Sequence, residues 1–197
     1  DKGKPTKNAK GELVCKNPFP TMPLKFWNDK NDNKFKDAYF NRFPNIWHHG
    51  DFAEIKKTKG FIIHGRSDTT LNPGGVRLGT AEIYSEVEKF KEIKESIVVG
   101  QSWDNDVRII LFIIMNEKFI LNEELLKKIK IQIRKNASPR HVPSKVIEVK
   151  DIPRTKSGKI VELAVKNTIE GNNIKNKEAL ANPEALEQFK NLKELNI

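Results

Sequence analysis

A short polar loop that ends in a lysine is the part of this sequence best suited to chemistry. Residues 153–160 read Pro-Arg-Thr-Lys-Ser-Gly-Lys-Ile, so Ser157 and Gly158 allow a tight turn and Lys159 follows it. An ammonium held at one point of a cleft can stabilise the negative charge that develops during group transfer. Lysine, serine and glycine also occur in ordinary solvated turns, so the loop needs support from other motifs.

A second group of motifs lies upstream, within residues 47–84. It begins with a His-Gly-Asp tripeptide that ends at Asp51 and continues with a Gly-Arg-Ser-Asp tetrapeptide that ends at Asp68. Residues 72–83 then read Asn-Pro-Gly-Gly-Val-Arg-Leu-Gly-Thr-Ala-Glu-Ile. Each motif alone is consistent with a turn, and their order and spacing carry the functional information.

In this order, the motifs resemble the C-terminal signature of the acyl-adenylate-forming enzymes. That signature has an aspartate after glycine, a Gly-Arg-x-Asp hinge, a Gly-x-Arg-(Leu/Ile)-Gly-x-x-Glu-Ile turn and a Ser-Gly-Lys loop. The resemblance implies an acid–thiol ligase with ATP, Mg and CoA as its cofactors and co-substrates. In such enzymes a carboxylate attacks Mg-ATP to give an acyl-adenylate and pyrophosphate, and the CoA thiol then displaces AMP.

The segments around the motifs resemble family members that act on acetoacetate. They include residues 11–15, 18–20, 26–29, 38–40, 43–47, 71–73 and 140–144. Acetate, propionate or a longer acid are alternative substrates. A basic nucleic-acid-binding module is a more distant alternative, because the net charge is +10. The lysines are interleaved with acidic residues, however, and form no long basic block.

The resemblance assigns nucleotide-binding roles to four residues. Asp51 matches the aspartate that accepts hydrogen bonds from both ribose hydroxyls, and a carboxylate has enough acceptors for that task. Arg66 matches a second ribose contact, and Arg77 matches an arginine that reaches the nucleotide phosphate. Lys159 matches the catalytic lysine, which contacts the carboxylate and the nucleotide during adenylation.

The CoA contacts implied by the resemblance lie further along the chain. Gly74 and Gly75 match the turn that passes the pantetheine arm, where a side chain would block the tunnel. Arg134 matches, more loosely, a contact to the 3′-phosphate, and Arg140 and Lys150 are alternatives. The four histidines have no metal-ligand spacing, so we expect no metal site formed by the protein itself.

The chain is expected to divide at Asp68, which matches the family's hinge. Residues 1–67 are interpreted as the strand-rich end of a large N-terminal, adenylate-binding domain. Residues 68–170 are interpreted as a small mobile α+β domain with a short mixed sheet flanked by helices, and residues 171–197 as a polar helical tail. With 197 residues and no Ser/Thr/Gly-rich phosphate loop, the chain is expected to need the missing N-terminal domain for activity. We expect a cytoplasmic protein without a membrane span, since mean hydropathy is -0.60.

Hydrophobic periodicity predicts the elements. Strands are expected at 12–15, 60–64, 97–99, 108–115 and 146–149, and the apolar run 109–114 should be buried on both faces. Helices are expected after Thr80, after Asn122, over 160–169 and over 183–192, with Thr80 and Asn122 as N-caps. Aromatic residues within 26–47 are expected to pack together in irregular structure.

Overall fold

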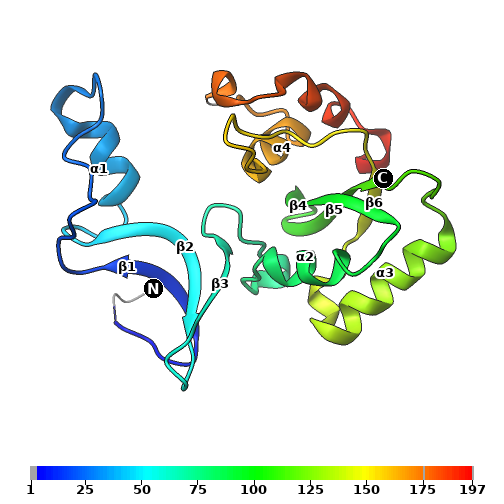
Figure 1. Cartoon of the computed structure of the whole chain (residues 1–197), viewed down its shortest axis with the longest axis horizontal. Coiled ribbons are helices and arrows are strands. Elements are labelled where there is room, and N and C mark those ends of the chain that lie inside the picture. The colour runs from blue at the N-terminus through cyan, green and yellow to red at the C-terminus, as the bar shows by residue number, and fades with distance from the viewer. Residues whose placement is uncertain (1–3, 175, 197) are drawn as a thin grey trace. The chain divides into compact units, whose positions relative to one another are not determined.

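The structure is a computed structural model that describes residues 4–174 and 176–196 (Figure 1). The chain forms two compact units, Asp1–Asp68 and Thr69–Ile197. Each unit has its own three-stranded sheet. None of the helices in the described ranges is both long and apolar enough to cross a membrane.

The sheet of the first unit is entirely antiparallel. It contains β1 (Lys10–Cys15), β2 (Trp47–Ile55) and β3 (Phe61–Arg66), with β2 in the middle. The stretch expected to be irregular also contains α1 (Asn33–Tyr39). That expectation was therefore wrong, because aromatic crowding concealed a two-turn helix whose rings pack against the start of β2.

Most aromatic side chains of this stretch do pack together. The rings of Tyr39 and Trp47 are stacked with centroids 3.7 Å apart, and Phe26 contacts both Phe35 and Tyr39 edge-on. Trp27 departs from the prediction, since 97% of its surface is exposed. The aromatic cluster therefore consists of the other rings: Phe26, Phe35, Tyr39, Phe40 and Trp47.

The second unit is built on a mixed sheet, as the sequence predicts. The strand β5 (Asp106–Met115) pairs antiparallel with β4 (Ile93–Trp103) and parallel with β6 (Lys145–Glu148). Residues 109–113 of β5 are buried, and they alternate between two hydrophobic clusters on the two faces of the sheet. The α+β class is thus confirmed.

Helices cover both faces of this sheet (Figure 1). The helices α2 (Ala81–Val87) and α3 (Glu123–Asn136) pack on one face. The other face is covered by α4 (Glu162–Ile169) and by the 3-10 helix Pro183–Phe189. The segment expected to be a polar tail therefore contributes to the hydrophobic core.

The predicted helix caps have different outcomes. Asn122 is confirmed as the N-cap of α3, because its side chain accepts from the backbone N–H of Leu125 at 2.9 Å. The predicted inward face of α3, which includes Ile129 and Ile133, is buried. Thr80 was wrongly predicted as a side-chain cap. Its backbone is already helical, with φ −71° and ψ −28°, whereas a capping side chain needs an extended backbone.

Two later helices also differ from their predicted form. The helix expected over 160–169 begins only at Glu162, because Ile160 pairs with Arg154 in a hairpin. The segment expected to be helical over 183–192 is a 3-10 helix that ends at Phe189. Burial of Leu186 and Phe189 fixes that turn, and burial depends on tertiary contacts that local periodicity does not report.

Candidate active site

Asp51 and Arg66 lie opposite each other on neighbouring strands of the first unit. They are register partners of β2 and β3, and Arg66 Nη1 lies 3.4 Å from Asp51 Oδ1. The same nitrogen donates to the backbone carbonyl of His49 at 3.2 Å. Cross-strand partners are held at a fixed spacing, so the ladder itself brings this carboxylate and guanidinium together.

Gly50 makes room for the guanidinium. Its φ is +84°, and a Cβ atom at this position would lie 2.6 Å from Arg66 Nη2. Any side chain would therefore displace Arg66 and also strain the backbone. The positive φ is the main reason for glycine before Asp51, and the close approach of Arg66 adds to it.

A cavity of about 770 Å³ opens beside the strand pair, within the first unit. Arg66 and Asp68 line it together with His49 and the aromatic residues Tyr39 and Trp47. Its size suits a nucleotide-sized ligand, because small-molecule pockets span roughly 300–1,000 Å³. The sequence favoured packing over a ligand-binding role for these aromatic residues, and the fold shows that Tyr39 and Trp47 also line the cavity.

A second feature that the sequence did not reveal is a carboxylate next to the predicted hinge. Glu12 on β1 accepts a hydrogen bond from the hydroxyl of Ser67, the residue before Asp68. The same carboxylate lies 2.7 Å from Arg42 Nη1 and 3.1 Å from His48 Nε2. Glu12 and Ser67 are far apart in sequence, so no local motif indicates this contact.

In the second unit, residues 71–78 form a turn, called here the glycine turn, which is closed at its base by a backbone bridge and has room for a side chain at its tip. Leu71 and Leu78 are buried and pair through two backbone hydrogen bonds, of 2.9 and 2.8 Å. Gly74 and Gly75 have φ of +58° and +74°, which favours glycine. The N–H of Gly74 donates to the carboxylate of Asp106, and a Cβ at Gly75 would meet no atom within 4 Å.

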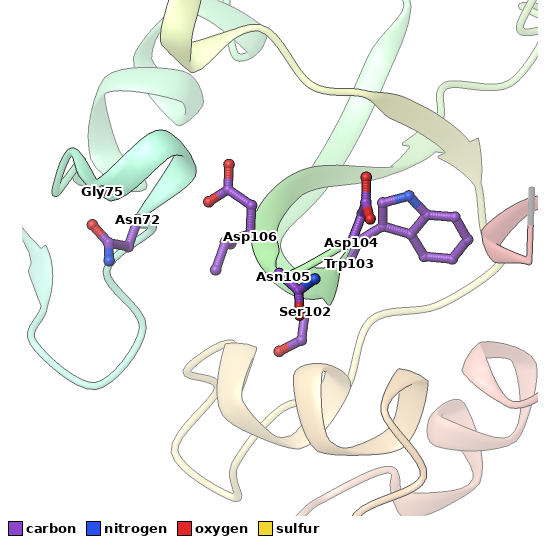
Figure 2. A pocket seen from close by; sticks show the side chains of 8 residues that line it. Asn72, Gly75, Ser102, Trp103, Asp104, Asn105 and Asp106 are labelled. Atoms are coloured by element: carbon purple, nitrogen blue, oxygen red, sulfur yellow. The ribbon is translucent and has the colours of Figure 1, made fainter.

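A cavity of about 640 Å³ lies between this turn and the tip of the β4–β5 hairpin (Figure 2). Asn72 and Gly75 line it from the turn, and Trp103, Asp104 and Asp106 line it from the hairpin. Figure 2 shows Asp106 projecting between the two elements. The carboxylates make this wall unfavourable for a phosphate and compatible with an uncharged chain.

Arg77 lies at the end of the glycine turn. It is half-buried, and its Nε donates to Thr70 Oγ1 at 3.0 Å. This bond ties the arginine to the strand-like residue before the Leu71–Leu78 bridge. The direction of the side chain is thereby set by the base of the turn.

The three candidate cations for a CoA phosphate lie on different elements. Arg134 is exposed in the last turn of α3. Lys150 is exposed just after β6. Arg140 lies beside the glycine turn, since a Cβ at Gly74 would be 3.9 Å from its Nη1. Its position beside the turn therefore favours Arg140 as the candidate cation for the CoA phosphate.

The lysine loop forms a closed hairpin. The N–H of Thr155 donates to the carbonyl of Lys159 at 2.8 Å, and the N–H of Lys159 donates to Thr155 Oγ1 at 3.1 Å. Gly158 has φ +83° at the tip, and Arg154 bridges to Ile160 at the base. The backbone of Lys159 is thus fixed while its side chain is exposed.

The predicted site residues fall into three groups. Asp51, Arg66 and Asp68 lie together in the first unit. The glycines of the turn lie together in the second unit, and Lys159 lies on its own hairpin. Among the described residues of the second unit, no hydrogen bond or ion pair joins the Lys159 side chain to the glycine turn. No cluster of three or more His, Cys, Asp or Glu side chains that could hold a metal occurs in the described ranges.

Comparisons with known proteins agree with this geometry. The family model of the AMP-binding enzyme C-terminal domain matches residues 82–159. The acetoacetyl-coenzyme A synthetase of Rhizobium meliloti is 58% identical over 99% of this chain and 30% of its own length. The acetoacetyl-CoA synthetase of Xenopus tropicalis is 48% identical over 99% of the chain and 29% of its own length. A solved acetoacetyl-CoA synthetase from Streptomyces lividans superposes with a TM-score of 0.90 at 39% identity, over 99% of this chain and 30% of that one.

The fold and the lysine hairpin thus resemble the C-terminal portion of the AMP-binding enzymes, and residues 82–159 match the model of that C-terminal domain. Within this class, the whole chain is similar to the acetoacetyl-CoA synthetases. It spans about 30% of the length of the curated relatives that it matches. The resemblance drawn from the motifs is confirmed.

Proposed function

We propose that this chain is the C-terminal part of an ATP-dependent acyl-CoA synthetase whose substrate is acetoacetate. The observation that carries the proposal is the match over 99% of the chain to an acetoacetyl-coenzyme A synthetase at 58% identity. The reaction converts acetoacetate, Mg-ATP and CoA into acetoacetyl-CoA, AMP and pyrophosphate through an acyl-adenylate. Magnesium enters with ATP as part of the substrate.

In the first half-reaction, the acetoacetate carboxylate attacks the α-phosphorus of ATP and pyrophosphate leaves. Asp51 accepts hydrogen bonds from the ribose hydroxyls, and Arg66, which lies 3.4 Å from it, orients that carboxylate and donates to the ribose. Arg77 contacts the phosphate. Lys159 contacts the attacking carboxylate and the nucleotide, so its ammonium offsets the charge that develops in the transition state.

In the second half-reaction, the CoA thiol attacks the acyl carbon and AMP leaves. The second unit turns about Asp68, which withdraws Lys159 and presents the glycine turn. Gly74 and Gly75 leave room for the pantetheine arm, and the open tip at Gly75 supports this role. Arg134 meets the 3′-phosphate of CoA, with Arg140 as the alternative favoured by its place beside the turn.

The acyl pocket and the phosphate loop belong to an N-terminal domain, which acts as the partner of this chain. The isolated 197-residue chain is therefore expected to be inactive. We place the enzyme in the cytoplasm. Acetate and propionate are the nearest alternative substrates, because they require the same chemistry in the second unit.

The test is acid-dependent ATP–pyrophosphate exchange in the full-length enzyme that carries this chain. Acetoacetate should support exchange, while acetate and propionate should support little. Exchange with only another acid would keep the reaction class and replace the substrate. If no carboxylic acid supported exchange, and the chain instead bound RNA with a steep salt dependence, the proposal would be wrong and the binding-module alternative would gain support.

The hinge can be tested separately. Asp68→Pro fixes φ near −65° at this position and should trap one arrangement of the two units. We expect one half-reaction to be retained and the other to be lost, as measured by pyrophosphate exchange and by thioester formation from preformed adenylate. Wild-type rates for both half-reactions would reject the hinge.

A further inference from the structure

The segment just before the lysine hairpin is bound to the C-terminal segment by one asparagine side chain. Asn182 Oδ1 accepts from the backbone N–H of Arg154 at 2.8 Å. Asn182 Nδ2 donates to Asp151 Oδ2 at 2.6 Å and to the carbonyl of Ile152 at 3.0 Å. A single half-buried amide thus makes three hydrogen bonds within four residues of chain.

Further bonds extend this contact in both directions. Gln188 accepts from the N–H of Lys150 at 2.8 Å and donates to the carbonyl of Asp151 at 2.7 Å. The N–H of Ala181 donates to the carbonyl of Arg154 at 2.8 Å, and the N–H of Lys156 donates to the carbonyl of Ala179 at 3.2 Å. Residues 179–181 therefore run beside the hairpin, with an isolated bridge between Thr155 and Leu180.

The C-terminal segment is itself anchored in the core. Leu186 and Phe189 are fully buried, and the Phe189 ring meets Phe112 of β5 edge-on with centroids 4.9 Å apart. A polar network joined to a packed core is rigid when all of its members are satisfied. Asn182 thus transmits the position of the sheet to the hairpin.

The far end of the hairpin is held independently. Glu162, the first residue of α4, accepts from the Tyr84 hydroxyl at 2.5 Å. At the base of the hairpin, Arg154 forms an ion pair with Glu95 of β4. The backbone around Lys159 is thereby fixed from both sides, although its side chain is exposed.

We propose that Asn182 is a positioning residue for Lys159, a role that rests on the proposed adenylation function. Within the described part of the second unit, no hydrogen bond or ion pair fixes the Lys159 ammonium, so its placement depends on where the hairpin lies. A displacement of about 1 Å in a reacting group can lower a rate by about 100-fold. Loss of the Asn182 bonds should therefore slow the step that uses Lys159 and spare the step that does not.

The first experiment is hydrogen exchange in the 197-residue chain. Asn182→Ala should speed exchange of the amides of residues 154–158 by about tenfold or more, with the amides of β5 unchanged. Asn172→Ala is the matched control, because Asn172 is an exposed asparagine of the same segment that bonds Glu170 instead. It should leave the hairpin amides unchanged.

The second experiment measures both half-reactions in the full-length enzyme. Asn182→Ala should lower acetoacetate-dependent ATP–pyrophosphate exchange by about tenfold to 100-fold, while thioester formation from preformed adenylate stays within about twofold. Gln188→Ala removes the neighbouring bonds and should give a smaller loss in the same direction. If Asn182→Ala does not fold, Gln188→Ala is used in its place.

The outcomes separate this inference from the proposed function. If no acid supported ATP–pyrophosphate exchange in the wild-type enzyme, the proposed function would fail. The hydrogen-exchange data would still report whether Asn182 holds the hairpin. If the hairpin amides did not change, or if both half-reactions fell equally, Asn182 would have no specific positioning role. Loss of adenylation alone, together with faster amide exchange, would support the proposal.

Discussion

The strand pair that carries Asp51 and the hairpin that carries Lys159 reach a fixed geometry by different routes. Asp51 and Arg66 are placed by one β-ladder, in which residues opposite each other must meet. Lys159 lies on a short hairpin whose position depends on contacts with residues 179–188 and with Tyr84. The Asp51–Arg66 pair is thus positioned by two adjacent strands, whereas the position of Lys159 depends on the core of the second unit.

This difference predicts which changes will be transmitted to a site. A change in the core of the second unit should loosen the lysine hairpin, since the hairpin has few contacts of its own. A change at the β2–β3 ladder should act only on its immediate neighbours.

Phe189→Ala should produce the largest effect. The ring is fully buried against Phe112, and loss of a buried phenyl group costs about 3–5 kcal/mol of unfolding free energy. Chemical denaturation followed by hydrogen exchange should show the second unit destabilised and the 154–158 amides exposed, with β2 and β3 unaffected. Phe119→Ala is the control, since Phe119 is 40% exposed, and it should cost less than about 1 kcal/mol. Equal effects of the two variants would refute the long-range support of the hairpin.

Asp51→Ala should weaken nucleotide binding in both half-reactions. In the proposed role, Asp51 makes two charge-assisted hydrogen bonds to the ribose, each worth about 1.5–3 kcal/mol, so their loss should raise KM for ATP about 100-fold or more. Asp51→Asn keeps one acceptor oxygen and should be intermediate. Asp37→Ala removes a negative charge from the cavity that Arg66 and Asp68 line, and it should leave KM unchanged. A similar loss in Asp37→Ala would reduce the effect to general electrostatics.

Gly75→Ala should affect the CoA step selectively. The backbone has φ +74°, so alanine is strained by about 1–2 kcal/mol, and the new methyl group enters the open tip of the turn. We expect KM for CoA to rise about tenfold while pyrophosphate exchange is retained. Gly171→Ala carries the same strain at φ +69°, outside the glycine turn, and should leave KM for CoA unchanged. A rise in both variants would assign the effect to strain.

Tyr84→Phe should have the smallest effect, and it should depend on pH. Desolvation of the hydroxyl raises the Tyr84 pKa above its ordinary value of 10.0, and the adjacent Glu162 raises the pKa further. The folded state therefore keeps a proton that the unfolded chain loses, so this contribution is complete below pH 10.0 and is lost as the pH rises through the folded-state pKa. Between about pH 8 and about pH 11, the wild type should lose more stability than Tyr84→Phe, as measured by urea denaturation. Equal losses would contradict the assignment.

The sequence predicted what depends on local pattern. The sequence was sufficient to predict the apolar run of β5, the Asn122 cap and the glycine turn, because each depends on neighbours within a few residues. Contacts such as Glu12 with Ser67 and Asn182 with Arg154 were not readable, because they join distant segments through single polar side chains. The roles of Asp51, Arg66, Arg77 and Lys159 were proposed from resemblance and stay predictions.

The most direct test of the account compares the two half-reactions in Lys159→Ala and the wild type. Loss of a group that stabilises transition-state charge costs about 10²–10³ in rate, so ATP–pyrophosphate exchange with acetoacetate should fall by that factor. Thioester formation from preformed acetoacetyl-adenylate should stay within about threefold of the wild type, because the proposed mechanism withdraws Lys159 in that step. An equal fall in both half-reactions, or no fall in exchange, would contradict the central claim that the lysine hairpin serves adenylation alone.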